Sequence, residues 1–425
     1  MSKKLKVLVF PCGSENATEI HSALRYSVHV DIYGASSIED HGRYTFEKYI
    51  GDLPNISEKN FDEVFSHLIS KLHIDIIFAT HDTVHEYLST RSSTMGFHLV
   101  NGDQKSAIIA RKKSLTYELF SDLPWAPIVF KDPSYITDWP VIAKPDCGQG
   151  GQGVKLVHSL DDAKKIESTI QDPVWMEYLT GDEITVDCFT DRNRNLLWVG
   201  PRTRERIKAG ISMRSTFLPP TESIREIATT INQRVTFRGP WFFQLKKDNF
   251  SQWKLLEFSC RVAGTMVSQR AKGINLPLMT IQDFLNRNLT TLPNKFIRLI
   301  DRKISTRAEL NFDYEKVYID LDETLIINNK AVPTVLSFVY QSIANGKKII
   351  LITRHTRDIK KSLASAKICI DIFDEIIHVK DGSYKSIFIH GKSIFIDNHF
   401  PERLDVALQK KIPTLDVDTL EFFIK

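Results

Sequence analysis

The sequence lacks several features that would place a 425-residue chain in a specialised class. It has no run of about 18 apolar residues, which a membrane-spanning helix needs, so no membrane partner is expected. Its five cysteines are widely spaced and none form a C-x-x-C pair, which argues against a zinc knuckle or a thioredoxin-like site. An odd number of scattered cysteines suits reduced thiols, and we therefore expect a cytoplasmic protein. The net charge of +4 gives no strong basic field, so nucleic acid is not an expected partner.

Short β-rich runs alternate with helical patterns along the whole chain, which indicates an α/β architecture. The first part, residues 1–102, begins with an apolar run at 6–10 and contains a later run at 74–80 that ends in His81 and Asp82. We expect a small doubly wound, Rossmann-like sheet here, and polar residues at such strand ends often line a crevice. No G-x-G-x-x-G follows the first run, so a dinucleotide site is not expected there.

The last part of the chain, residues 312–425, contains three predicted strands that each end in a polar residue of a catalytic type: Asp320, Thr353 and Asp397. The carboxyl ends of parallel strands converge on one crevice, so Asp320, Asp322 and Asp397 would bring several carboxylates together. Such carboxylates repel one another unless a hard cation lies among them, and Mg²⁺ prefers oxygen ligands. The pattern predicts a magnesium site. The alternative is that Asp322 caps a turn and Asp397 only ends a strand.

The order of these residues, D-x-D-x-T at 320–324 followed by Thr353, Lys385 and Asp397, resembles the four motifs of the haloacid dehalogenase (HAD) superfamily of phosphatases. The resemblance implies a Rossmann-like domain in which Asp320 is the nucleophile and Asp322 is the general acid–base. It also implies that Asp320, Asp397 and the backbone carbonyl of Asp322 hold the metal. Thr353 would bind phosphate, and Lys385 would stabilise the negative charge in the site. These groups are chemically sufficient for phosphoryl transfer. The short segment 324–353 predicts little or no cap.

A glycine-rich loop lies between two predicted strands in the second part of the chain, residues 103–311. It follows Lys144 and contains four glycines: Gly148, Gly150, Gly151 and Gly153. The spacing formally fits G-x-G-x-x-G, but a β-like run follows it instead of a helix, and Val154 stands where a Walker A motif needs lysine. Such a loop still exposes backbone N–H groups to a phosphate chain, and Lys144 adds a cation. The alternative is a flexible hairpin tip.

A second pattern in the same part is a predicted hairpin with its turn near residues 250–251, which places Gln244 opposite Glu257. Period-two alternation puts Glu257, Ser259 and Arg261 on one face. An acid, its amide partner and an arginine on one face suit a magnesium–nucleotide triphosphate. An ordinary surface hairpin would not explain the Phe and Leu residues around them.

Together the loop and the hairpin resemble an ATP-grasp fold of the carbamoyl-phosphate-synthetase-like branch, over residues 1–311. The resemblance implies a pre-ATP-grasp domain at 1–102, an α+β ATP-grasp domain at 103–311, and ATP and Mg²⁺ as cofactors, with Mn²⁺ as an alternative metal. The residues that it implies for the nucleotide are Lys113, Lys144, Gly148, Gly150, Gly151, Gly153, Glu177, Leu179, Glu183 and Arg261. Arg204 and Arg206, together with Arg214, are expected to bind phosphate or an acidic substrate.

The implied metal ligands are Gln244, Glu257 and Ser259, and one of them departs from the family pattern. The family usually has Glu-x-Asn, whereas Ser259 stands at the position of the asparagine. A hydroxyl is a weaker metal ligand than an amide carbonyl. We therefore expect a second Mg²⁺ to be held less tightly, or through water.

Enzymes of this fold typically activate a carboxylate as an acyl phosphate, which an amine then attacks, and positioning and charge neutralisation lower the barrier. The leading hypothesis is a bifunctional biosynthetic enzyme, an ATP-dependent carboxylate–amine ligase joined to a HAD phosphatase. Its partners would be a small carboxylate, an amine or a phosphorylated metabolite, and association into a homo-oligomer is compatible with the sequence. Two alternatives stay open: an ATP-grasp kinase with a stable phosphorylated product, and a non-catalytic ATP-sensing module that controls the phosphatase.

Overall fold

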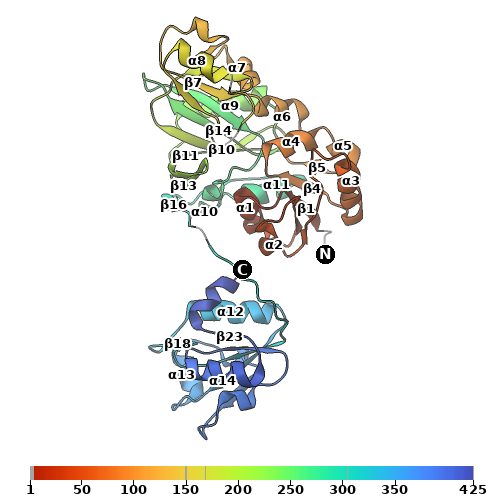
Figure 1. Cartoon of the computed structure of the whole chain (residues 1–425), viewed down its shortest axis with the longest axis vertical. Coiled ribbons are helices and arrows are strands. Elements are labelled where there is room, and N and C mark those ends of the chain that lie inside the picture. Colours follow the sequence, from red (N-terminus) through yellow and green to blue (C-terminus); the bar gives the residue numbers. More distant parts are fainter. Residues whose placement is uncertain (1–3, 149–150, 168, 304, 425) are drawn as a thin grey trace. The chain divides into compact units, whose positions relative to one another are not determined.

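The computed structural model describes residues 4–148, 151–167, 169–303 and 305–424 (Figure 1). The chain divides into two compact units, Met1–Lys303 and Ile304–Lys425, and each is described by itself. The three domains expected from the sequence, residues 1–102, 103–311 and 312–425, divide the chain at other points, and their boundaries stay a prediction.

The larger unit begins with a five-stranded parallel sheet in the order β3-β2-β1-β4-β5. Its strands are β1 (Leu5–Phe10), β2 (Val30–Ala35), β3 (Tyr49–Ile50), β4 (Ile76–Ala79) and β5 (His98–Leu99). The helices of this part are α1 (Glu15–Leu24), α2 (Gly42–Thr45), α3 (Phe61–Leu72), α4 (Asp82–Ser89) and α5 (Ser92–Met95). Because β1 and β4 are parallel neighbours, the starts of α1 and α4 leave the sheet at the same edge.

Two antiparallel sheets follow, each with four strands. The first has the order β6-β9-β7-β8, with β6 (Val129–Phe130), β7 (Val141–Pro145), β8 (Lys155–Val157) and β9 (Pro173–Glu177). The second has the order β11-β10-β14-β15, with β10 (Glu183–Thr190), β11 (Leu196–Thr203), β14 (Gly239–Lys247) and β15 (Trp253–Ser259). The hairpin β14–β15 has the predicted pairing of Gln244 with Glu257.

A three-stranded sheet and several helices complete the larger unit. The sheet consists of β12 (Glu205–Lys208), β13 (Ile211–Thr216) and β16 (Leu299–Asp301). The helices are α6 (Gln104–Arg111), α7 (Lys113–Phe120), η1 (Pro133–Tyr135), α8 (Leu160–Glu167), α9 (Glu222–Arg234), α10 (Val267–Ala271) and α11 (Leu276–Phe284). One face of the second antiparallel sheet packs against α9 in a core that contains Ile227, Ile231 and Phe243.

The first parallel sheet and the second antiparallel sheet share one hydrophobic core. Val7 and Val9 of β1 belong to the same buried cluster as Phe189 of β10 and Phe242 of β14. The first antiparallel sheet instead has a small core of its own, which includes Ala143 of β7.

The smaller unit is built on a five-stranded parallel sheet in the order β21-β20-β17-β22-β23. Its strands are β17 (Lys316–Ile319), β20 (Lys348–Thr353), β21 (Glu375–His378), β22 (Ser393–Ile396) and β23 (Thr414–Leu415). The helices are α12 (Pro333–Ala344), α13 (Ile359–Ser365), η2 (Ile370–Ile372), η3 (Lys385–Phe388), α14 (Phe400–Lys410) and η4 (Val417–Phe423). Between Thr324 and β20, a segment described in full, lie only α12 and the hairpin of β18 (Ile326–Ile327) and β19 (Lys330–Ala331), so no domain is inserted there.

Candidate active site

Two rows of side chains cross one face of the sheet β11-β10-β14-β15. Strand register aligns the first row as Arg202, Thr185, Gln244 and Glu257, and the second as Gly200, Asp187, Phe242 and Ser259. Side chains alternate along each strand, so both rows point away from the face that packs on α9. The register shifts after Gln244 through a bulge at Leu256, and Leu256 and Glu257 both line the cavity described next.

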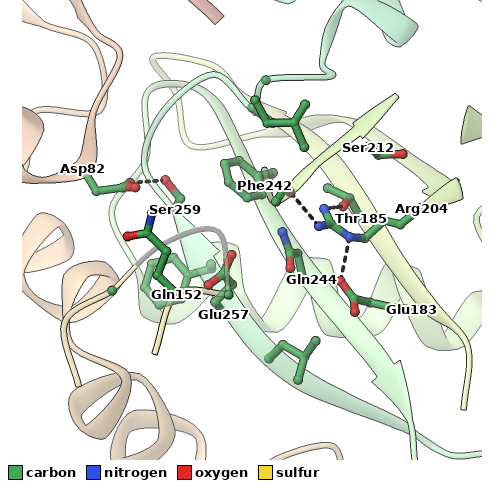
Figure 2. A pocket seen from close by; sticks show the side chains of 18 of the residues that line it. Asp82, Gln152, Glu183, Thr185, Arg204, Ser212, Phe242, Gln244, Glu257 and Ser259 are labelled. Atoms are coloured by element: carbon green, nitrogen blue, oxygen red, sulfur yellow. Dashed lines mark hydrogen bonds and ion pairs between the residues drawn. The ribbon is translucent and has the colours of Figure 1, made fainter. Parts of the chain in front are cut away.

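A cavity of about 680 Å³ lies over these rows, and Figure 2 shows part of its lining. Apolar side chains, including Ile142, Met176 and Leu179, gather where the two antiparallel sheets contribute to the lining. The first parallel sheet contributes polar residues from the segments that follow β1 and β4, including Asn16 and Asp82. The cavity therefore combines an apolar part with a strongly charged part, as small-molecule sites commonly do.

Two lysines line the charged part of the cavity. Lys144, at the end of β7, is buried and its Nζ donates to the hydroxyl of Tyr117 at 2.5 Å. Burial and the neighbouring Lys113 together lower the pKa of Lys144 to about 7. The Nζ of Lys113 lies 3.4 Å from the backbone oxygens of Asp146 and Gly148, and burial also lowers its pKa. An anion in the cavity would stabilise the charged form of both lysines.

The pair Gln244 and Glu257 fits a magnesium ion that is bound together with a nucleotide. The two residues are direct neighbours across β14 and β15, and both line the cavity. Burial raises the pKa of Glu257, although the charge of Lys113 opposes this. In the described part of the chain no group of three or more His, Cys, Asp or Glu side chains is placed to hold a metal. Mg²⁺ bound with a nucleotide needs only one or two protein ligands, because phosphate and water oxygens supply the others.

Arg204 connects the sheet to the hairpin β12–β13. Its Nε lies 2.6 Å from Oε1 of Glu183 (Figure 2). Its Nη2 donates to the backbone oxygen of Gly210 at 2.9 Å. Gly210 and Ala209 have φ values of 78° and 47°, as the tight turn of a two-residue hairpin requires. The tip of this hairpin lines the cavity and is tied to Glu183 through one guanidinium.

Asp82 reaches the cavity from the first residue of α4. Its Oδ1 accepts a hydrogen bond of 2.7 Å from the hydroxyl of Ser259, and its Oδ2 accepts one of 2.7 Å from Nη2 of Arg261. Burial alone would raise the pKa of Asp82, but Arg261 and Ser259 together lower it below its ordinary value. Asp82 therefore stays ionised.

Arg202 forms a buried ion pair beneath the cavity. Its Nε lies 2.7 Å from Oδ2 of Asp187, which also accepts a hydrogen bond of 3.0 Å from Nε2 of Gln269. Both charged side chains are almost completely buried. The pair holds β10 and β11 together on the cavity face.

Replacing Arg202 with methionine should lower the free energy of unfolding of the larger unit by about 3 kcal/mol, because Asp187 is left buried without a charged partner. Urea unfolding followed by tryptophan fluorescence measures this unit alone, since all 6 tryptophans lie between residues 125 and 253. Arg206→Met is the matched control, because Arg206 pairs with Asp301 at the surface, where an ion pair contributes less than about 1 kcal/mol. Equal losses in the two variants would contradict the prediction.

Most residues predicted for the nucleotide, its metal and the substrate line the cavity: Lys113, Lys144, Gly148, Gly151, Glu177, Leu179, Glu183, Arg204, Gln244, Glu257, Ser259 and Arg261. Of the predicted residues that the structure describes, Arg206 and Gly153 are not part of the lining, and Arg214 pairs with Glu205. Gly150 lies outside the described residues. The position of Asp82 at the end of a predicted strand was one signal for this site, but no pattern indicated Tyr117 or the cavity position of Arg202.

In the smaller unit, three predicted residues meet at the carboxyl ends of β17 and β22. The Nζ of Lys385 donates to Oδ1 of Asp320 at 2.6 Å and to Oδ2 of Asp397 at 2.7 Å, and all three side chains are buried. Burial raises the pKa of Asp320 to about 6, although Lys385 opposes this. The two carboxylates thus converge on the ammonium group of Lys385 itself. Carboxylate oxygens are ligands of the kind that Mg²⁺ prefers, and a lysine can neutralise a transferring phosphoryl group.

The Asp322 carboxylate does not join this pair. It is more than half exposed and lies 2.9 Å, through Oδ1, from Nδ1 of His355. The other ring nitrogen of His355 lies 2.7 Å from the hydroxyl of Ser362, and Thr353 is completely buried at the end of β20. Sequence reasoning did not single out His355, because it stands in a loop without a recognisable pattern.

Comparison with known proteins supports the ATP-grasp resemblance. The family described as ATP-grasp in the biosynthetic pathway with Ter operon matches residues 169–305, which is less than half of the chain. No curated protein matches the sequence.

Three of the solved structures that resemble the chain each cover about two thirds of it. The biotin carboxylase domain of the 2-oxoglutarate carboxylase from Hydrogenobacter thermophilus, solved with MgADP, ADP and bicarbonate, has a TM-score of 0.57 and 14% identity, and the match covers 70% of this chain and 73% of the other. N5-carboxyaminoimidazole synthetase from Staphylococcus aureus, complexed with ADP, has a TM-score of 0.56 and 14% identity, with coverage of 69% and 80%. The L-amino acid ligase from Bacillus licheniformis has a TM-score of 0.53 and 14% identity, with coverage of 66% and 74%.

The chain therefore contains a mixed α/β ATP-grasp fold, and the comparisons support ATP and Mg²⁺ as its cofactors. The matched family segment ends at residue 305, so the HAD resemblance of the following residues stays a prediction. Of the helices within residues 4–148, 151–167, 169–303 and 305–424, none is long and apolar enough to cross a membrane.

Proposed function

We propose that the larger unit is an ATP-dependent ligase that activates a small carboxylate as an acyl phosphate for attack by an amine or a related nucleophile. The observation that carries this proposal is the cavity, in which an apolar part lies beside Lys113, Lys144 and the neighbours Gln244 and Glu257. The similar solved structures include an amino acid ligase and two proteins whose names refer to carboxylation, each of which fits this class of reaction.

Each group in the cavity has a role in this proposal. The adenine would lie against Met176 and Leu179, beside Glu177, and the ribose would lie near Glu183. Lys113, Lys144 and the backbone of the glycine-rich loop would neutralise and position the phosphates. Gln244 and Glu257 would hold Mg²⁺, which neutralises the charge that develops on the transferred phosphoryl group.

The test is the release of ADP and phosphate by the purified full-length protein across a panel of carboxylate and amine pairs. A ligase releases both and leaves no phosphate on the product, whereas an ATP-grasp kinase leaves phosphate on it, which mass spectrometry separates. If no pair yields ADP and Lys144→Ala does not change ATP binding, the proposed ligase activity is wrong.

Binding of ATP should take up close to one proton at pH 8, because the pKa of Lys144 is lowered to about 7 in the free protein. Above that pH the free lysine is mostly neutral, and the bound phosphates favour its charged form. The uptake should disappear near pH 6, where the lysine is already charged. Calorimetry in two buffers of different ionisation enthalpy measures the uptake, and Lys144→Met should abolish it. The same uptake in the variant would contradict the assignment to Lys144.

For the smaller unit we propose a Mg²⁺-dependent phosphatase of the HAD type, with Asp320 as nucleophile, Asp322 as general acid–base and Asp397 as metal ligand. The geometry that supports this is the convergence of Asp320 and Asp397 on Lys385. Thr353 would bind the phosphate. The absence of an inserted domain between Thr324 and β20 would leave the site open to large substrates.

A second candidate function follows from Ser259, which replaces the usual asparagine. The larger unit would then bind ATP without turnover and control the phosphatase. This candidate predicts tight ATP binding, no ADP release with any substrate, and phosphatase activity that changes with ATP.

A further inference from the structure

Ser259 is the point at which the cavity departs from the Glu-x-Asn pattern. It lies two residues after Glu257 on the same face of β15, and it lines the cavity. An asparagine here would present an amide oxygen to a second Mg²⁺. A serine hydroxyl presents a weaker ligand unless its surroundings strengthen it.

The surroundings of Ser259 contain such a group. Its hydroxyl donates to Oδ1 of Asp82 at 2.7 Å, as Figure 2 shows, so its lone pairs are not used by that bond. Asp82 belongs to α4, 177 residues away in the sequence, and its other oxygen is held by Arg261 at 2.7 Å. Ser259, Asp82 and Arg261 all line the cavity.

A hydroxyl that donates its proton to a carboxylate has a more electron-rich oxygen. Carboxylates that accept hydrogen bonds from metal ligands raise the basicity of those ligands in the same way, and they also fix their orientation. Arg261 balances the charge of Asp82 through an ion pair of 2.7 Å, which also holds the carboxylate in place to accept the hydrogen bond from Ser259.

We propose that Asp82, acting through the hydroxyl of Ser259, replaces the missing asparagine in holding a second Mg²⁺ beside bound ATP. This role rests on the proposed binding of ATP by the larger unit. Asp82 is a positioning residue for the metal, because its two oxygens are engaged by Ser259 and Arg261. The competing explanation is that Asp82 only orients Arg261.

The experiment titrates Mn²⁺ into the full-length protein with β,γ-methylene ATP and measures free Mn²⁺ by electron paramagnetic resonance. The wild type should bind two Mn²⁺ ions per nucleotide complex. Ser259→Ala and Asp82→Asn should each weaken the binding of the second Mn²⁺ about tenfold and leave the affinity for the first Mn²⁺ unchanged. Asp62→Asn is the matched control, because Asp62 also pairs with an arginine, Arg91, at 2.8 Å, outside the cavity lining. It should change neither affinity.

A double-mutant cycle separates the two explanations. Ser259→Asn restores the amide oxygen as a metal ligand. In the Ser259→Asn background, Asp82→Asn should therefore change the affinity for the second Mn²⁺ by less than about twofold. An equal loss in both backgrounds, or no loss in either, would overturn the proposal. If the wild type binds the nucleotide with a single Mn²⁺, the proposed role of Asp82 is wrong and the proposed ligase function is unaffected. If the wild type binds no nucleotide, the proposed ligase function is wrong as well. Tryptophan fluorescence during urea unfolding verifies that each variant is folded.

Discussion

Replacing Asp320 with asparagine should reduce Mg²⁺-dependent hydrolysis of p-nitrophenyl phosphate by at least about a thousandfold. An amide has nearly the shape of the carboxylate, but it cannot accept the phosphoryl group. Lys385, which now contacts both Asp320 and Asp397, would keep one of its two carboxylate partners, so the site should remain assembled. A steady-state assay of p-nitrophenol release measures the loss.

The matched control for this variant is Asp371→Asn. Asp371 is exposed in η2, which precedes β21 and therefore lies toward the amino end of that strand, away from Asp320. Its replacement should leave the rate unchanged. Full activity of Asp320→Asn would end the assignment of Asp320 as nucleophile, whatever the larger unit does.

The second large effect is expected from Lys144→Met in the larger unit. ADP release should fall about a hundredfold, because the variant removes a buried cation that is positioned where phosphate charge develops. Methionine preserves much of the side-chain length and volume, so the apolar packing near Tyr117 should be retained. Turnover is measured with the carboxylate and amine pair that gives the highest rate, and ATP affinity is measured by calorimetry.

Lys155→Met provides the comparison for Lys144. Lys155 lies on β8, which pairs with β7, but its side chain is exposed and does not line the cavity. Its replacement should change the rate by less than about twofold. A similar loss in both variants would indicate a general effect of charge on the protein rather than a role of Lys144 in the site.

Local patterns predicted much of the fold. The pairing of Gln244 with Glu257 followed from alternation and the polar turn, because a hairpin's register depends on neighbouring residues. The strands before Asp320, Thr353 and Asp397 were found because buried parallel strands are short apolar runs with a clear end.

Contacts between distant segments could not be predicted from local patterns. The partner of Ser259 lies 177 residues away, and no local period indicates that α4 and β15 meet. The bulge at Leu256 is also invisible in the sequence, since a single extra residue leaves the alternation on either side intact. His355 contacts Asp322 because the loops that follow the parallel neighbours β17 and β20 leave the sheet at the same edge, and that pairing joins segments about 30 residues apart.

The shared core beneath the cavity has a mechanical consequence. β1, β10 and β14 bury Val9, Phe189 and Phe242 in one cluster, so the sheet whose β4 leads into Asp82 and the sheet that carries Glu257 share one close-packed core. The sheet that carries Lys144 has a small core of its own, and a second small cluster packs its Met176 near Leu256 of β15. A shift of this sheet would therefore change the width of the cavity at Lys144 and leave the contact between Asp82 and Ser259 intact, because that contact depends on the larger core.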